Sequence, residues 1–212
     1  TYTGPITLST GAITLTATDA NITFSGSTTT INGAQALTIN AGTGTIAFGG
    51  VVGGTTAISS LELQGSGSNT LPSAITASGA IDLKGSSRTN TLAAATTLTS
   101  NSAGTITLGN TNGAYALSIS NGAGIIDLAT IGSTTNLASL TLFGTGINQL
   151  RGSITTTGAI DLKGTSRTTQ LFFSPTITAS NANVTIGTID GGTGTTAGTY
   201  SLTIANGSGT IT

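Results

Sequence analysis

One stretch occurs twice in this sequence, first as Gly79-Ala80-Ile81-Asp82-Leu83-Lys84-Gly85-Ser86-Ser87-Arg88-Thr89 and again as Gly158-Ala159-Ile160-Asp161-Leu162-Lys163-Gly164-Thr165-Ser166-Arg167-Thr168. A chain that repeats itself at a fixed spacing is typical of stacked units, because each unit can bury its apolar face only against its neighbours. The sequence therefore indicates a repeat architecture.

The repetition extends over most of the chain. The segment 36–39 (ALTI) returns at 116–119 (ALSI), and 60–63 (SLEL) returns at 139–142 (SLTL). These matches give a long repeat with a period of about 79–80 residues. A third, partial copy begins at Tyr200, after a longer loop at 191–198. We expect one continuous body over 1–212, with units near 36–115 and 116–199 and partial copies at 1–35 and 200–212.

Within each unit, aliphatic residues alternate with Thr, Ser, Ala or Asp. This period of two predicts strands with one apolar and one polar face, and helical spacing is sustained nowhere. The aliphatic members should be buried and the polar members between them exposed. The buried set includes Ile81, Leu83, Ile160, Leu162, Leu37 and Ile39, and the exposed set includes Asp82, Asp161 and Thr38.

Such strands suit either an antiparallel sandwich or a parallel solenoid. Ile13, Leu37 and Leu61 are evenly spaced in the sequence, and Phe24 and Phe48 have the same separation. Similar residues recur at one spacing when coils stack on copies of themselves, whereas sandwich strands have distinct neighbours. The sequence therefore predicts an all-β parallel β-helix (β-solenoid) of about 9–11 coils, each of roughly 20–24 residues, with three or four coils in a long unit.

Composition excludes several classes of function. A net charge of −1 without a basic cluster argues against nucleic acid as a partner. No apolar run approaches the roughly 20 residues of a membrane-spanning helix, so no membrane insertion of this segment is expected. The chain has no His and no Cys, hence no imidazole base, no thiolate and no usual zinc ligand set. We expect no cofactor and no metal.

The six carboxylates are the remaining candidates for catalysis. They lie singly in six separate segments of the sequence, at Asp19, Glu62, Asp82, Asp127, Asp161 and Asp190. A glycan-active β-helix needs two or three acidic groups converging in a cleft. Nothing in the sequence indicates such convergence, so we predict that the protein is not an enzyme.

The repeated stretch also suggests a surface patch. Asp82 and Lys84 should share one strand face, with Arg88 just past the next turn, and Asp161, Lys163 and Arg167 repeat the arrangement. One interpretation is a surface ion pair with an arginine that anchors the turn. The other is a weak ligand-contacting patch that recurs along the molecule. Phe172 would join it, because inward Leu171 leaves Phe172 outside unless a loop covers it.

The phrases themselves resemble a known class of repeat. The runs at 36–50 (ALTINAGTGTIAFGG) and 55–63 (TTAISSLEL) resemble the repeats of large bacterial exoproteins of the filamentous haemagglutinin-like type, including two-partner-secreted adhesins of biofilm matrices. The resemblance implies a right-handed parallel β-helix that serves as the rigid shaft of an adhesin.

The predicted function is accordingly structural: a stalk or spacer of a secreted or cell-surface bacterial adhesin, with an extracellular or bacterial cell-surface location. Expected partners are extracellular polysaccharide and other copies of the chain, stacked end to end through open strand edges. Two alternatives stay open. They are a glycan-active β-helix enzyme and a self-assembling S-layer or filament subunit.

Overall fold

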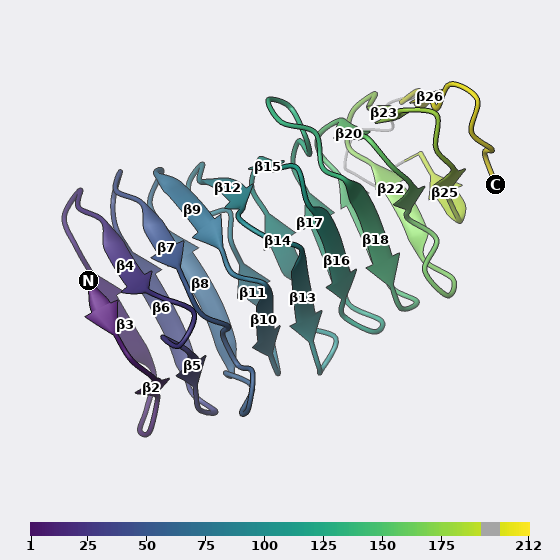
Figure 1. The fold of residues 1–212 in the computed structure, drawn as a ribbon. Helices are drawn as coiled ribbons and strands as arrows, with labels where there is room; N and C mark the ends of the chain where they lie inside the picture. The colour runs from purple at the N-terminus through teal and green to yellow at the C-terminus, as the bar shows by residue number, and fades with distance from the viewer. Residues whose placement is uncertain (192–199) are drawn as a thin grey trace.

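The computed structural model describes residues 1–191 and 200–212, so the longer loop expected at 191–198 lies outside the described residues apart from Gly191. The described residues form short β-strands and no helix. The strands wind into about nine coils that follow one another from the N-terminus to the C-terminus (Figure 1). The predicted β-solenoid is therefore confirmed, with a coil number at the low end of the expected range.

Each coil contributes a strand position to each of three faces. Face A contains β1 (Tyr2–Thr3), β4 (Ile22–Ser25), β7 (Ile46–Phe48), β9 (Ser68–Leu71), β12 (Thr89–Leu92), β15 (Thr111–Asn112), β20 (Ile154–Thr156), β23 (Thr176–Ala179) and β26 (Thr203–Ala205). Ile131 bridges β15 to β20.

Face B contains β2 (Ile6–Thr7), β5 (Ile31–Asn32), β10 (Ala74–Ala77), β13 (Thr96–Ser100), β16 (Ala116–Ser120), β18 (Ser139–Phe143), β21 (Ile160–Asp161) and β24 (Val184–Thr185), with Val52 bridging β5 to β10. Face C contains β3 (Ile13–Thr16), β6 (Ala36–Asn40), β8 (Ser60–Gln64), β11 (Ile81–Asp82), β14 (Ile106–Leu108), β17 (Ile125–Leu128), β19 (Ile147–Leu150), β22 (Thr168–Leu171) and β25 (Thr188–Asp190).

Adjacent coils pair in parallel, as predicted. Ile13 pairs with Leu37, and Leu37 pairs with Leu61, so the even spacing of these residues in the sequence is the length of the first coils on face C. Later coils are longer or shorter, because Leu61 pairs with Ile81 and Ile81 with Ile106. The difference is absorbed in the turns between the faces.

The core fills the interior of the coil from end to end. Aliphatic side chains at alternate strand positions point inward, and the six aliphatic residues expected to be buried are at most 1% exposed. Phe24 stacks on Phe48 with ring centroids 5.3 Å apart, and Tyr2 stacks on Phe24 at 5.2 Å. Asp82, Asp161 and Thr38 point outward as predicted but are half-buried, since coils above and below flank them.

The long repeat does not contain a whole number of coils. From β6 to β15 it has eleven strand positions, counting Val52, and from β16 to β25 it has eleven again, counting Ile131. A coil uses three positions, so one unit covers three coils and two further strands. Corresponding strands of successive units therefore lie on different faces, as β11 on face C and β21 on face B.

Candidate functional site

The predicted patch does not form as a surface ion pair. The carboxylate of Asp82 accepts a hydrogen bond from the main-chain N–H of Lys84 at 2.8 Å, and Asp161 accepts one from Lys163 at 2.9 Å. No ion pair joins Asp82 to Lys84 or Asp161 to Lys163. The carboxylate of each stretch fixes its own turn, which corrects the ion-pair interpretation.

The two arginines of the patch lie inside the molecule. Arg88 and Arg167 are each 1% exposed, so neither can contact a ligand at the surface, and the patch interpretation is wrong for both. Their guanidinium groups donate to main-chain carbonyls of preceding coils, such as Gln64 at 2.9 Å from Arg88. The turn-anchoring interpretation is confirmed. Burial lowers the pKa of Arg88 and lowers that of Arg167 to about 10. A guanidinium group stays protonated at neutral pH in proteins.

The two copies of the stretch also face different sides. Asp82 ends β11 on face C and Asp161 ends β21 on face B, because a unit contains eleven strand positions. A partner lying along one side of the molecule therefore meets only one copy. The two copies therefore recur along the molecule on different sides.

Phe172 is half-buried, although its neighbour Leu171 points inward as predicted. The guanidinium of Arg151 lies over the Phe172 ring at 4.0 Å from the centroid. The same guanidinium donates from Nε to both carboxylate oxygens of Asp127 at 2.9 Å, and from Nη2 to Gln149 at 3.1 Å. A charged side chain therefore lies over this ring.

Stacking aligns four of the six carboxylates in one row on face C. Outward positions follow one another there in register as Thr14, Thr38, Glu62, Asp82, Thr107, Asp127, Gln149, Gln170 and Asp190. The described strands of face A carry no charged residue, and those of face B carry only Asp161. The alignment was not recognised in the sequence, because the four acids lie in separate segments. Their spacings of one to three coil lengths could have indicated it.

The described carboxylates of the row do not form a metal centre. Among residues 1–191 and 200–212, no group of three or more Asp or Glu side chains could hold a metal ion. Glu62 and Asp82 are neighbours across one coil step, and a shallow depression beside them is also bordered by Asn40 and Gln64. These carboxylates and amides can accept and donate hydrogen bonds to a polar partner along one side of the coil.

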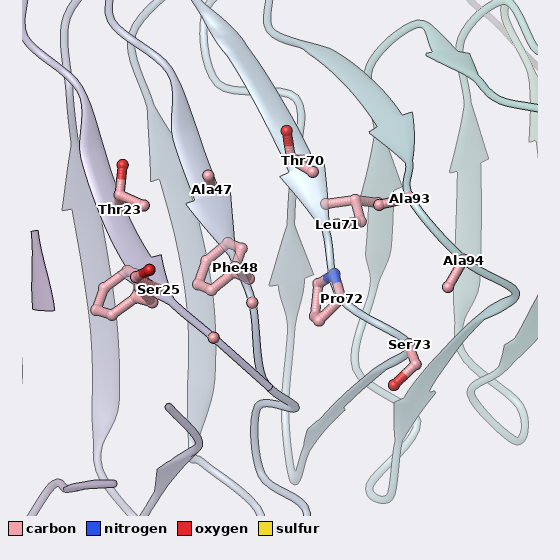
Figure 2. Close-up of a pocket in the computed structure, with 13 residues that line it drawn as sticks. Thr23, Ser25, Ala47, Phe48, Thr70, Leu71, Pro72, Ser73, Ala93 and Ala94 are labelled. Carbon is pink, nitrogen blue, oxygen red and sulfur yellow. The ribbon is translucent and has the colours of Figure 1, made fainter. Parts of the chain in front are cut away.

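A groove runs across four coils of face A (Figure 2). Thr23, Ala47 and Thr70 occupy registered outward positions along it, as Figure 2 shows, and Pro72 and Ala93 lie in the turns that follow the strands. Its lining residues are Thr23, Phe24, Ser25, Gly26, Ala47, Phe48, Gly49, Thr70, Leu71, Pro72, Ser73, Ala93 and Ala94.

The groove exists because one repeat has small residues where the next has large ones. When the two long units are aligned, Ala47, Thr70, Pro72 and Ala93 of the first match Asp127, Gln149, Arg151 and Phe172 of the second. In the second unit Arg151 contacts the other three side chains, and together they fill the space. The first unit is therefore hollow on face A at the position where the second is filled on face C.

The arrangement offers neutral hydroxyl and methyl groups on face A and acids with amides on face C. No helix in the described part of the chain is long and apolar enough to cross a membrane. No protein-family model matches this chain, and no curated protein or solved structure is significantly similar to it.

Proposed function

We propose that this segment is a rigid shaft, a stalk or spacer within a secreted or cell-surface bacterial adhesin. The observation that supports it is the unbroken parallel stack from β1 to β26 with one continuous core. About nine coils at about 4.8 Å per coil span roughly 40–45 Å. A stack of this kind can hold its two ends apart.

The repeated phrases support the location. Runs such as 36–50 resemble those of filamentous haemagglutinin-like exoproteins, and this resemblance favours a position outside the cell or on the bacterial surface. Extracellular polysaccharide is the proposed lateral partner. The groove on face A and the polar row on face C are where its hydroxyl groups would find hydrogen-bonding side chains.

If the segment is a shaft, added repeats should displace a binding module outward without changing its affinity for its ligand. The chain is placed between a surface anchor and a binding module of known ligand, and the strands β6 to β15 are duplicated in a second version. Each added unit should move the module outward by about 18 Å, because it adds three coils and two strands at about 4.8 Å per coil. The module's affinity for its ligand should not change.

Two other results would contradict the shaft function. If the duplication leaves the reach unchanged, the stack does not act as a spacer. If the chain alone releases reducing ends from polysaccharides, and a Glu62→Gln/Asp82→Asn variant does not, the glycan-active alternative is correct. A fusion of the anchor directly to the module, without the chain, is the control for both the displacement measurement and the polysaccharide assay.

A self-assembling filament is the second candidate function, and the 212-residue polypeptide by itself can test it. Ile189 and Ile211 near the C-terminal edge are 47% and 53% exposed, and Tyr2, Ile6 and Ile13 border an apolar depression at the N-terminal edge. Edges of this type pair with other strands. Light scattering of the 212-residue polypeptide should show association that rises with concentration and weakens in Thr210→Lys. Monomers at every concentration would contradict the filament.

A further inference from the structure

The side chain of Arg88 is enclosed by acceptor oxygens from two preceding coils. All three of its nitrogen atoms donate, and the five contacts use the five N–H groups that a guanidinium possesses. The acceptors are Asn69 Oδ1 at 2.6 Å, Ser68 O at 2.7 Å, Gly44 O at 2.8 Å, Gln64 O at 2.9 Å and Gly42 O at 3.3 Å. We call these five oxygens the cradle.

The second unit builds an equivalent cradle on another corner, with Asn121 Oδ1 as a sixth acceptor. Arg167 donates to Asn148 Oδ1 and Asn121 Oδ1, and to the carbonyl oxygens of Phe143 at 3.0 Å, Ile147 at 2.9 Å, Gly124 at 2.9 Å and Gly122 at 3.3 Å. The first cradle joins faces C and A, whereas the second joins faces B and C. The local sequence therefore builds the cradle whichever face it lies on.

All five oxygens of the first cradle belong to coils that precede the coil of Arg88, although that coil helps to orient one of them. The five oxygens come from residues 19 to 46 positions earlier in the chain. The amide of Asn69 is held in place by its own bonds, from Nδ2 to Leu83 O at 3.1 Å and to Asn90 Oδ1 at 2.8 Å. The other four acceptors are main-chain carbonyls at one corner of the coil. Gly42 and Gly44 lie in the turn after β6, Gln64 ends β8 and Ser68 begins β9.

Neutral oxygens alone compensate the buried charge. Among the residues that the structure describes, no carboxylate forms an ion pair with Arg88 or Arg167. The planar fork of a guanidinium matches acceptors on two levels, whereas an ammonium is a point charge with three donors. The cradle is therefore selective for shape as well as for charge.

We propose that each cradle is a guanidinium-binding site in its own right, which the chain fills with its own arginine to lock three consecutive coils in register. An emptied cradle should then bind a small guanidinium compound. Access is available, because Arg88 also borders a surface depression with Lys84 and Ser86. Truncation of Arg88 would connect the cradle to solvent.

The test uses the full chain with Arg88→Ala and methylguanidinium chloride at low millimolar concentration as the probe. The thermal midpoint of Arg88→Ala should lie below that of the wild type and should rise saturably with methylguanidinium. Calorimetry should give one site for Arg88→Ala, two for Arg88→Ala/Arg167→Ala, and none for the wild type. If a variant fails to fold alone, its refolding yield with the probe replaces the midpoint.

Matched controls separate a built site from general solvent effects. Urea has the planar shape without the charge, and methylammonium has the charge without the fork, so neither should raise the midpoint of Arg88→Ala. Lys84→Ala removes a nearby cation outside the cradle and should create no site. The proposal is overturned if the variant folds as stably as the wild type, if the probe neither binds nor restores folding, or if all three compounds act alike.

Discussion

Several polar side chains inside the coil are bonded to neighbouring coils. Asn69 is fully buried, yet its amide nitrogen donates to a carbonyl of the next coil and its oxygen accepts from Arg88. Burying an amide without such bonds costs free energy, so these contacts allow polar groups in a narrow apolar interior. At the level of single residues, the stack is held by directional bonds between coils as well as by aliphatic contacts.

Asp19 makes such a link at the surface and gives it a pH dependence. Its Oδ1 accepts from the N–H of Thr43 at 2.9 Å and from the Thr43 hydroxyl at 3.0 Å, and these bonds hold its pKa below the ordinary 3.8. A carboxyl whose pKa is lowered by folding stabilises the fold above its ordinary pKa, and the contribution disappears as the pH falls through the folded value.

The Asp19→Asn variant should therefore lose less stability than the wild type when the pH is lowered below 3.8. Asn keeps the acceptor oxygen without titrating, as Asn181 does where it accepts from Ser208. Thermal midpoints of both proteins from neutral to acidic pH measure the effect. A difference between the two that stays constant over the whole range would show that the Asp19 carboxylate does not contribute.

At the level of strands and turns, the close approach of neighbouring coils determines which positions require glycine. Gly65 has a φ of +95°, and a Cβ there would lie 2.1 Å from the carbonyl oxygen of Gly42 in the preceding coil. Gly26 has a similar φ of +88° but open space around it. The two positions share the backbone requirement and differ only in the neighbouring coil.

Gly65→Ala and Gly26→Ala form a matched pair. Both should lose about 1–2 kcal/mol for an alanine at positive φ. Gly65→Ala should lose roughly 1–3 kcal/mol more, because the methyl group must displace the adjacent coil. Midpoints of urea unfolding measure the difference. Equal losses would mean that the coils are not stacked at the spacing described.

Alternation within strands was predictable from sequence because it depends on neighbours two residues apart. Ile81 and Leu83 needed no knowledge of other coils to be recognised as core residues. The burial of Arg88 could not be recognised in this way, since its acceptors lie up to 46 residues earlier and depend on coils of unequal length. Because the coils differ in length, Glu62, Asp82 and Asp127 are unevenly spaced in the sequence. The register of strand pairing nevertheless aligns them in one row on face C.

For the whole molecule, the eleven-strand unit determines what the surface presents. Each new unit places its equivalent strands on a different face, and three units make eleven whole coils before the same face recurs. Features repeated in the sequence are therefore distributed around the shaft. This arrangement favours a spacer in which the repeats maintain the stack. It is less suited to presenting the same repeated ligand contacts along one side.

The central claim is that successive coils stack in register, and distances between spin labels along face C test it most directly. The chain has no Cys, so Thr14→Cys combined with Thr107→Cys, Asp127→Cys or Gln170→Cys places labels only where intended. These pairs lie four, five and seven coil steps apart. Pulsed electron paramagnetic resonance should give narrow distributions near about 19, 24 and 34 Å, at about 4.8 Å per step. Distances that do not increase with coil number, or broad distributions for all three pairs, would contradict the stacked solenoid.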